Sequence, residues 1–423
     1  MLKINMGRNK KYEGYKAFQY LEPGIDYVDL KLREKEITEE WQEPVPLSKT
    51  EEEKFEEIIE KNIVIDLHAH PNVGLEDRSQ SYLSMRDGRN FLAYEALSIS
   101  GLDCILDNLM DGGCFINTKR GWDWMGTIHD LGMKLSDIAH QNFFIHCKKV
   151  EDIIEAHKTG KLAWVAVLES SSCIENEVDR LDVLYGLGVR SMGVNYSESN
   201  MLGSGLKELK DGGLTDFGYD AVIRMNKLGI LVDVSHLSDQ TALDTAALSK
   251  KPIICSHSGV RALTPTTRMF PDEVIQAIAE KGGVMAIEAA PNLTVTKKNP
   301  LHSIESYMEH IEYCIELVGI DYVGCGPDTM YGDHLGGYLD SIASSGKMGI
   351  GHYSRPERGK ATRHLGIDMD VEALKKLKYV RGMENPTECL QNVARWMVKH
   401  GYSDQEIAKV IGGNGLRLLK EVW

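Results

Sequence analysis

Short apolar segments alternate with amphipathic, helix-like segments from residue 62 onward. The segment at residues 63–68 is short and rich in β-branched residues, which predicts a buried strand. Similar segments predict further strands at residues 113–117, 163–168, 190–195, 230–235, 252–256, 283–288 and 322–326. The stretches between them include predicted helices at residues 215–228, 238–249, 271–281 and 303–318.

Eight strand–helix units within about 260 residues predict a closed parallel barrel, the (β/α)8 or TIM-type α/β fold. Thr215 and Ser238 are predicted N-caps, and Gly229 and Gly319 are predicted helix ends. A doubly wound open sheet is the competing fold, but it has no need for polar residues at the ends of so many strands. We therefore expect a barrel with long loops at the mouth where the strands end.

Residues 1–60 differ in pattern from the rest of the chain. They carry several aromatic residues and a charged stretch, and Thr50 followed by three glutamates predicts a helix start. We expect residues 1–60 to form an N-terminal arm and helix packed on the barrel. Residues 61–423 are then the barrel with its C-terminal helices. A partly disordered tail is the alternative for the first part of the arm.

The composition restricts the partners. The 423 residues include 48 Lys and Arg against 63 Asp and Glu, and the net charge of -15 argues against nucleic-acid binding. No apolar run approaches the length of a membrane span, and the N-terminus lacks the apolar core of a signal peptide. The eight Cys are scattered without CxxC spacing, which is typical of reduced core thiols. We expect a cytoplasmic protein with neither a nucleic acid nor a membrane as partner.

Polar residues with metal-ligand chemistry follow the predicted strands. In such barrels the active site lies at the C-terminal mouth, where these residues would meet. Side chains two apart on a strand point the same way, so His68 and His70 can reach one point. The strand-end candidates are His68, His70, Glu169, Asn195, Tyr196, His236, His257 and Asp328.

These side chains suit a centre with two metal ions. His68 and His70 would hold one ion, while His236 and His257 would hold the other, with Glu169 as the bridge. Two ions about 3.5–4 Å apart can share a hydroxide and polarise a carbonyl. Asp328 is placed to take the proton of the attacking water and return it to a leaving amine. That division of roles indicates metal-assisted hydrolysis of an amide or a related bond.

Each residue alone has an ordinary structural interpretation. His236 could be a hydrogen-bonded residue at the rim, Glu169 a helix cap or ion-pair partner, and Asp328 a turn residue. Taken together, these residues favour a metal site over separate structural roles. Burying four imidazoles and a carboxylate on one rim would cost free energy without a shared partner.

The chain resembles the membrane (renal) dipeptidase family of the amidohydrolase superfamily from about residue 63 to its end. The most specific stretches are residues 213–218, 225–229 with 232–236, and 256–258, and residues 412–417 close the match. The resemblance implies a two-zinc barrel, bridged by Glu169, with His236 and His257 at the second site and Asp328 as proton shuttle. It further implies that Arg268 holds a substrate carboxylate, a role suited to its bidentate guanidinium, and that the protein is a homodimer.

Three positions depart from the family pattern. His70 stands where the dipeptidases have Asp, and Tyr196 stands where they have a substrate-contacting His. The tyrosine phenol can donate to an oxyanion, which makes Tyr196 a candidate for both catalysis and substrate binding. After Asp328, the residues 329–331 replace the Phe-Asp-Gly that is usual in the family.

The leading prediction is a zinc-dependent hydrolase of the membrane dipeptidase type, with two Zn²⁺, or another divalent metal, per chain. Its substrate would be a dipeptide or small N-acyl amino acid, cleaved by a metal-bridging hydroxide. One alternative is a metal-dependent amidohydrolase acting on a cyclic amide or lactone, and another is a catalytically silent zinc-binding protein.

Three features near the predicted mouth are secondary. The insertion at residues 331–370 is a candidate lid, and we expect its histidines, among them His334, to be solvated. Trp122 could line the pocket. The favoured interpretation of Glu288, after the seventh predicted strand, is a structural salt bridge.

Overall fold

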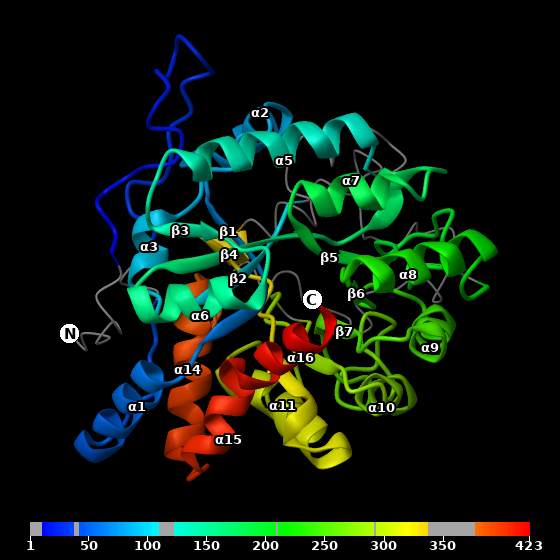
Figure 1. The fold of residues 1–423 in the computed structure, drawn as a ribbon. Coiled ribbons are helices and arrows are strands. Elements are labelled where there is room, and N and C mark those ends of the chain that lie inside the picture. Colours follow the sequence, from blue (N-terminus) through cyan, green and yellow to red (C-terminus); the bar gives the residue numbers. More distant parts are fainter. Residues whose placement is uncertain (1–10, 38–41, 110–121, 209, 292, 337–376) are drawn as a thin grey trace.

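A ring of parallel strands forms the centre of the molecule (Figure 1). The fold is known from a computed structural model that describes residues 11–37, 42–109, 122–208, 210–291, 293–336 and 377–423. The strands pair in the order β10-β1-β2-β4-β5-β6-β7-β8-β9, and β3 pairs with β4 beside this path. Their bounds are β1 Ile65–Val73, β2 Cys104–Asn108, β3 Phe144–His146, β4 Leu162–Leu168, β5 Val189–Gly193, β6 Leu231–Asp233, β7 Ile254–Ser258, β8 Val284–Ile287, β9 Val323–Cys325 and β10 Met330–Tyr331.

The ring closes between the first and the last strands. β9 pairs with β8, and β10, only a few residues later, pairs with β1 through His70 and Met330. The Asp328 amide also donates to the His68 carbonyl at 2.9 Å. This closure confirms the predicted TIM-type α/β barrel.

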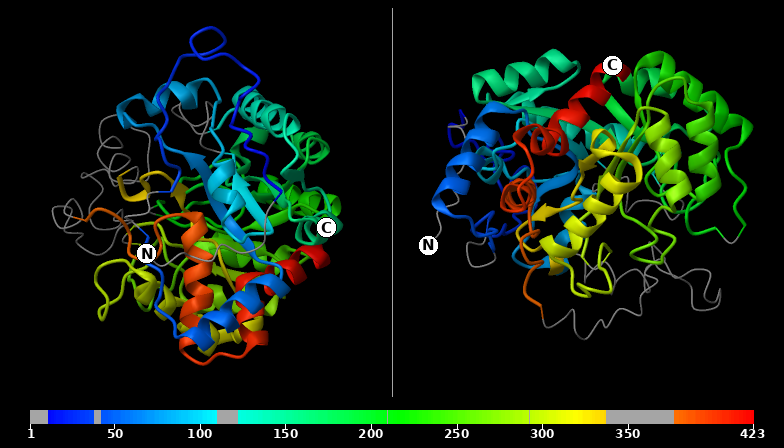
Figure 2. Two further views of the ribbon diagram at one scale, coloured as in Figure 1. Left: turned by 90° about the vertical axis from the view of Figure 1, so that its left-hand side faces the viewer. Right: turned by 90° about the horizontal axis from the view of Figure 1, so that it is seen from below.

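Helices surround the strands on the outside (Figure 2). Two of the predicted caps are confirmed, since the Thr215 hydroxyl accepts from the Gly218 amide and the Ser238 hydroxyl from the Thr241 amide. The helices are α1 Lys49–Lys61, α2 Ser81–Arg86, α3 Tyr94–Ser98, α5 Trp124–Ala139, α6 Val150–Thr159, α7 Arg180–Gly186, α8 Asp216–Leu228, α9 Asp239–Leu248, α10 Asp272–Glu280, α11 Ile304–Val318, α14 Pro386–Lys399, α15 Asp404–Ala408 and α16 Asn414–Val422, with short turns η2 Arg78–Gln80, η3 Ser171–Ile174, η4 Ile320–Tyr322 and η6 Lys409–Gly413.

Two apolar cores flank the strands. The inner core joins strand residues such as Ile65, Leu67 and Val165 to Leu418 and Leu419 of α16, which covers one end of the barrel. The outer core lies between the strands and the surrounding helices. Because both faces of the strands are buried, their sequences are almost continuously apolar, as is usual for parallel sheets.

The second strand of the ring was not predicted from the sequence. The strand expected at residues 113–117 lies outside the described residues, and β2 at Cys104–Asn108 takes the second place in the ring. The charged residue Asp107 made this segment look unlike a buried strand. In the structure its carboxylate is buried, where it pairs with Lys134 of α5 and accepts from the Trp164 indole. A charged residue at a buried position looks like a loop residue until its partner is known.

The N-terminal part of the chain lies against the barrel helices. The Asp137 carboxylate of α5 accepts from the Phe18 amide at 2.6 Å and from the Tyr15 hydroxyl at 2.7 Å. Helix α1 begins one residue before the predicted Thr50, after the N-cap Ser48, and contacts α14. The division of the chain at residues 60 and 61 stays a prediction. Over the parts of the chain that the structure describes, no helix combines the length and the apolar character that crossing a membrane requires.

Candidate metal centre

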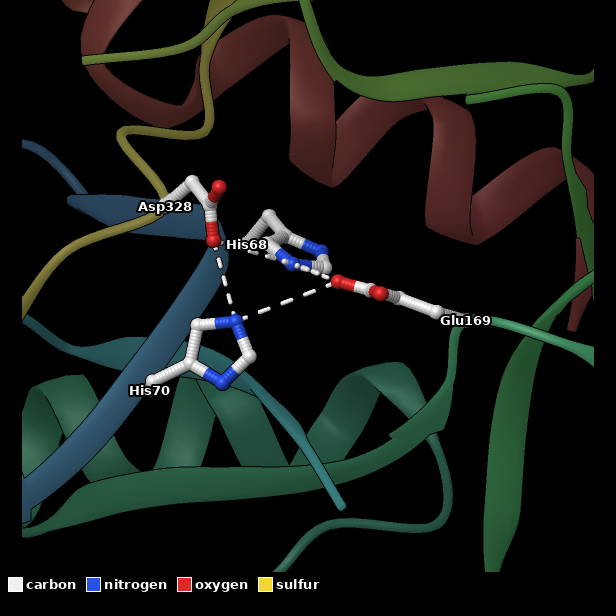
Figure 3. A group of neighbouring side chains, drawn as sticks. All are labelled: His68, His70, Glu169 and Asp328. Atoms are coloured by element: carbon white, nitrogen blue, oxygen red, sulfur yellow. Dashed lines mark ion pairs between the residues drawn. The ribbon is translucent and has the colours of Figure 1, made fainter. Parts of the chain in front are cut away.

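Four of the predicted site residues meet at the mouth of the barrel (Figure 3). His68 and His70 come from β1, Glu169 directly follows β4, and Asp328 lies between β9 and β10. The Nε2 atom of His68 is 2.7 Å from Glu169 Oε1, and the Nε2 atom of His70 is 2.9 Å from Asp328 Oδ1. The four donor atoms all lie within 4.8 Å of one another, which is close enough to surround one ion.

A second group shares Glu169 with the first. His236 follows β6 and His257 lies in β7, and their Nε2 atoms are 2.8 Å apart. His257 Nε2 is 3.7 Å from Glu169 Oε1. The structure therefore brings together all five predicted ligands, with the carboxylate between the two pairs of imidazoles as the sequence predicts.

Serine hydroxyls orient the two imidazoles of the second group. Ser197 Oγ lies 2.9 Å from His236 Nδ1, and Ser256 Oγ lies 2.8 Å from His257 Nδ1. Ser256 in turn hydrogen-bonds to Asp233. These contacts occupy the Nδ1 atoms, so the Nε2 atoms are left to face the centre. Partners of this kind fix the orientation and the tautomer of metal-binding histidines.

Irregular pairing turns His68 and His257 toward the centre. Leu67 belongs to the inner core and Ala69 to the outer core, and the β1–β2 register shifts between Asp66 and Ala69. Regular alternation from Leu67 would turn His68 toward the helices. The β7–β8 register also shifts, between Cys255 and Ser258, next to His257. Bulges of this kind often re-aim side chains beside active sites.

Left-handed backbone is concentrated at the same place. Ser197, His236 and Asp328 have φ angles of 57°, 66° and 58°, in the region that non-glycine residues seldom adopt. Each such residue lowers the stability of the fold by about 1–3 kcal/mol, and interactions in the surrounding structure must offset this strain. Such strain is typical of functional sites, and two of these three residues are predicted site residues.

The charges of the cluster suit divalent cations. Burial lowers the pKa of His257 well below its usual value, which favours a neutral imidazole with a free lone pair. Burial raises the pKa of Asp328, but the hydrogen bond from His70 and the charges of His70, His68 and Arg268 lower it to about 2 overall. Burial also raises the pKa of Glu169, opposed by His68. Among the described residues His68 Nε2 has no hydrogen-bond partner, although Glu169 lies close. These nitrogen and oxygen atoms carry lone pairs and have few protons to share, so they repel one another at short distance. A bound metal ion would remove this repulsion.

Aromatic rings form one wall beside the second group. The Tyr196 ring centroid lies 4.3 Å from that of His236, and the Trp122 ring lies 4.8 Å from Tyr196 in an edge-on arrangement. Tyr196 thus stands next to the centre, as the sequence predicts. On another side, Arg268 forms a buried ion pair with Glu288, which confirms the salt bridge expected for that glutamate.

Sequence reasoning missed the residues that support the ligands. Ser197, Ser256 and Asp233 gave no separate signal, although a carboxylate inside an apolar strand, as in Asp233, is a usable sign of a buried polar role. The prediction for His334 was wrong, because its side chain is only 4% exposed and its pKa is lowered to about 4 by burial. The other histidines of the insertion lie outside the described residues.

Gly193 of β5 leaves room for the backbone of Glu169. A Cβ atom at residue 193 would lie 2.0 Å from the Glu169 carbonyl oxygen, which is far inside contact distance. We expect Gly193→Ala to destabilise the fold by about 1–3 kcal/mol and to weaken metal binding by displacing Glu169. Chemical denaturation and metal analysis would measure the two effects. Gly186→Ala, where no atom lies within 4 Å, is the matched control. Equal stability of the two variants would contradict this account.

A parallel barrel with imidazoles and carboxylates converging at its mouth is the architecture of a metallo-hydrolase. The sequence profile of the family described as membrane dipeptidase (peptidase family M19) matches residues 131–340. An uncharacterized protein in the pqqA 5′ region of Klebsiella pneumoniae is 30% identical over 285 residues, which cover 66% of this chain and 88% of that protein. The chain therefore belongs to the membrane dipeptidase family, as its resemblance predicts.

A second relative and one solved structure are also similar to this chain. Dipeptidase tcpJ of Claviceps purpurea (strain 20.1) is 26% identical over 308 residues, which cover 72% of this chain but only 60% of that relative. The chain thus spans less than two thirds of the length of that relative. A metallo peptidase from Rhodobacter sphaeroides, solved with a phosphinate mimic of the dipeptide L-Ala-D-Ala, shares the fold with a TM-score of 0.61. It is 21% identical, and the match covers 86% of this chain and 100% of that chain.

Proposed function

We propose that this protein is a zinc-dependent hydrolase of the membrane dipeptidase type that cleaves the amide bond of a dipeptide or small N-acyl amino acid. The observation that carries the proposal is that two donor groups share Glu169, with Asp328 beside it. Membership of the family and the name of the Claviceps relative support a dipeptide as substrate.

Two ions would be held by side chains whose donor atoms converge at the mouth. We assign His68 and His70 to one ion, His236 and His257 to the other, and Glu169 to both. Imidazole nitrogens with a carboxylate are a donor set that zinc favours. Zinc bound there would polarise the scissile carbonyl and lower the pKa of the attacking water, so that it reacts as hydroxide.

Asp328 would move the proton. Its carboxylate lies 2.9 Å from His70, beside the donor atoms, where it would accept a proton from water and then give it to the leaving amine. Tyr196 would donate its phenol hydrogen to the oxyanion that forms on the substrate. Arg268 would bind the substrate at a distance from the scissile bond.

Removal of the metal tests this proposal directly. We expect about two zinc ions per chain by elemental analysis, in line with the two donor groups. Dialysis against excess chelator should lower dipeptide hydrolysis by at least about 100-fold, and added zinc should restore it. Manganese and cobalt, added separately, would show whether zinc is the preferred ion. Full activity of the metal-free protein would rule out the mechanism.

A cyclic amide or lactone is the second candidate substrate. The ion pair of Arg268 with Glu288 favours it, because the partner carboxylate already neutralises the cation expected to hold a substrate carboxylate. Hydrolysis of a dipeptide panel beside a panel of cyclic amides and lactones separates the two candidates. Bound metal without hydrolysis of any panel member would instead favour a catalytically silent zinc-binding protein. The cytoplasmic location and the homodimer stay predictions.

A further inference from the structure

A buried ion pair lies beside the candidate metal centre. Arg268 comes from the loop between β7 and α10, and Glu288 directly follows β8. Arg268 Nη2 is 2.5 Å from Glu288 Oε2, and the two side chains are only 6% and 0% exposed. The proposed mechanism assigns no role to the carboxylate of this pair.

Backbone hydrogen bonds fix the pair between two predicted site residues. The Glu288 amide donates to the Ser258 carbonyl at 2.8 Å, and the Ser258 hydroxyl donates to the Arg268 carbonyl at 2.9 Å. Ser258 directly follows His257. The next amide, that of Ala289, donates to the carbonyl of Pro327 at 2.7 Å, one residue before Asp328. The pair therefore lies on the rim between His257 and Asp328, where it would contact a part of the substrate at a distance from the scissile bond.

Each partner of the pair has one atom left for a ligand. Among the described residues, neither Arg268 Nη1 nor Glu288 Oε1 has a hydrogen-bond partner, although both atoms are buried. Buried polar atoms are nearly always hydrogen-bonded in native proteins, so an exception needs an explanation. The two atoms offer one donor and one acceptor. A ligand group with a carbonyl and an N–H would satisfy both.

A free carboxylate fits this pair poorly. It could accept from Arg268, but it has no hydrogen to offer Glu288 and would meet the negative charge of that residue. An amide has both groups and no charge. Met269 and Ala290, which neighbour the pair in sequence, form a small apolar cluster with Leu293. An apolar environment penalises an added charge more than an added amide.

We propose that Glu288 is a specificity-determining residue, which makes this pair select an uncharged amide group of the substrate over a free carboxylate. The inference rests on the proposed hydrolase function and changes its expected substrate from a free dipeptide or N-acyl amino acid to one without a free carboxylate. The preferred substrates are then C-terminally amidated dipeptides or cyclic amides. Arg268 donates to the carbonyl of the substrate amide, and Glu288 accepts from its N–H.

A pair of matched substrates tests the preference. We expect the wild-type, metal-loaded enzyme to cleave a dipeptide amide with a kcat/KM at least about tenfold above that of the same dipeptide as free acid. Glu288→Gln removes the negative charge and should shift this ratio toward the free acid by at least about tenfold. Glu52→Gln is the matched control, because Glu52 pairs with the buried Arg395 far from the mouth. Its substrate ratio should equal that of the wild type.

A second measurement does not depend on turnover. Glu288→Ala leaves the buried cation of Arg268 without a partner and leaves a space of carboxylate size. Acetate or propionate should therefore raise the melting temperature of this variant by several degrees, whereas acetamide should not. Neither the wild type nor Glu175→Ala, which removes only the surface partner of Arg180, should respond in this way. If Glu288→Ala does not fold, the same comparison is made with Glu288→Ser, whose short side chain also leaves this space open.

The outcomes separate the inference from the proposed function. A wild type that prefers the free acid, or a Glu288→Gln variant with an unchanged ratio, overturns the inference and leaves the hydrolase function intact. Absence of stabilisation by acetate likewise overturns it. If neither the dipeptide nor its amide is hydrolysed, the proposed function fails, and the substrate preference fails with it.

Discussion

Asp328→Asn is expected to keep the bound metal and to lose hydrolytic turnover by about 100- to 10,000-fold. Asparagine has nearly the shape of aspartate, but its amide cannot accept the proton of the attacking water. The wild-type carboxylate lies 2.9 Å from His70 and is ionised at neutral pH. The measurement compares kcat on a dipeptide substrate with metal content from elemental analysis.

The metal content of Asp328→Asn separates two possible roles of Asp328, proton shuttle and metal ligand. Turnover lost with both ions retained supports a proton shuttle, whereas the loss of one ion would reassign Asp328 as a ligand of the first group. Asp321→Asn is the control, since Asp321 lies at the opposite end of β9 and pairs with Lys409 on the surface. Retained turnover in Asp328→Asn would remove this residue from the mechanism.

Glu169→Gln is expected to have the other large effect, because both donor groups depend on this one carboxylate. The amide of glutamine is neutral and presents only one oxygen. Metal affinity should fall by at least about 100-fold, more than is usual for residues that only support ligands. Elemental analysis after dialysis should show fewer than two ions per chain, and hydrolysis should fall with them.

A nearby glutamate provides the comparison for this variant. Glu175 follows Glu169 by six residues but lies on the surface, where it pairs with Arg180. Glu175→Gln should keep both metal content and activity. Two ions and full activity in Glu169→Gln would refute the bridging role.

The barrel and the meeting of its strand-end residues could be predicted because both follow from periodicity. In a parallel barrel every strand ends at the same mouth, so a polar residue after each apolar run is placed without knowledge of its neighbours. His236 and Glu169 were found in this way. The family resemblance added Arg268, which no periodic pattern marks.

The local irregularities could not be predicted in the same way. Strict alternation from Leu67 would turn His68 outward, and only a register shift that depends on the neighbouring strand turns it inward. Likewise Asp107 resembles a loop residue until Lys134, far along the chain, is seen to neutralise it. The unsatisfied Oε1 atom of Glu288 could not be predicted either, since an unpaired atom is a property of three-dimensional surroundings.

The pairing of β1 with β10, the seam of the barrel, completes both the barrel and the candidate metal centre. His70 and Asp328 stand on the two sides of this seam, separated by most of the length of the chain. An ion bound by His70, which hydrogen-bonds to Asp328 across this seam, would stabilise the closed ring by an amount that grows with metal concentration. A polypeptide that has not yet reached its last strands, such as one still leaving the ribosome, cannot display the complete centre. The complete centre, and with it the proposed hydrolytic activity, can therefore form only after the barrel has closed.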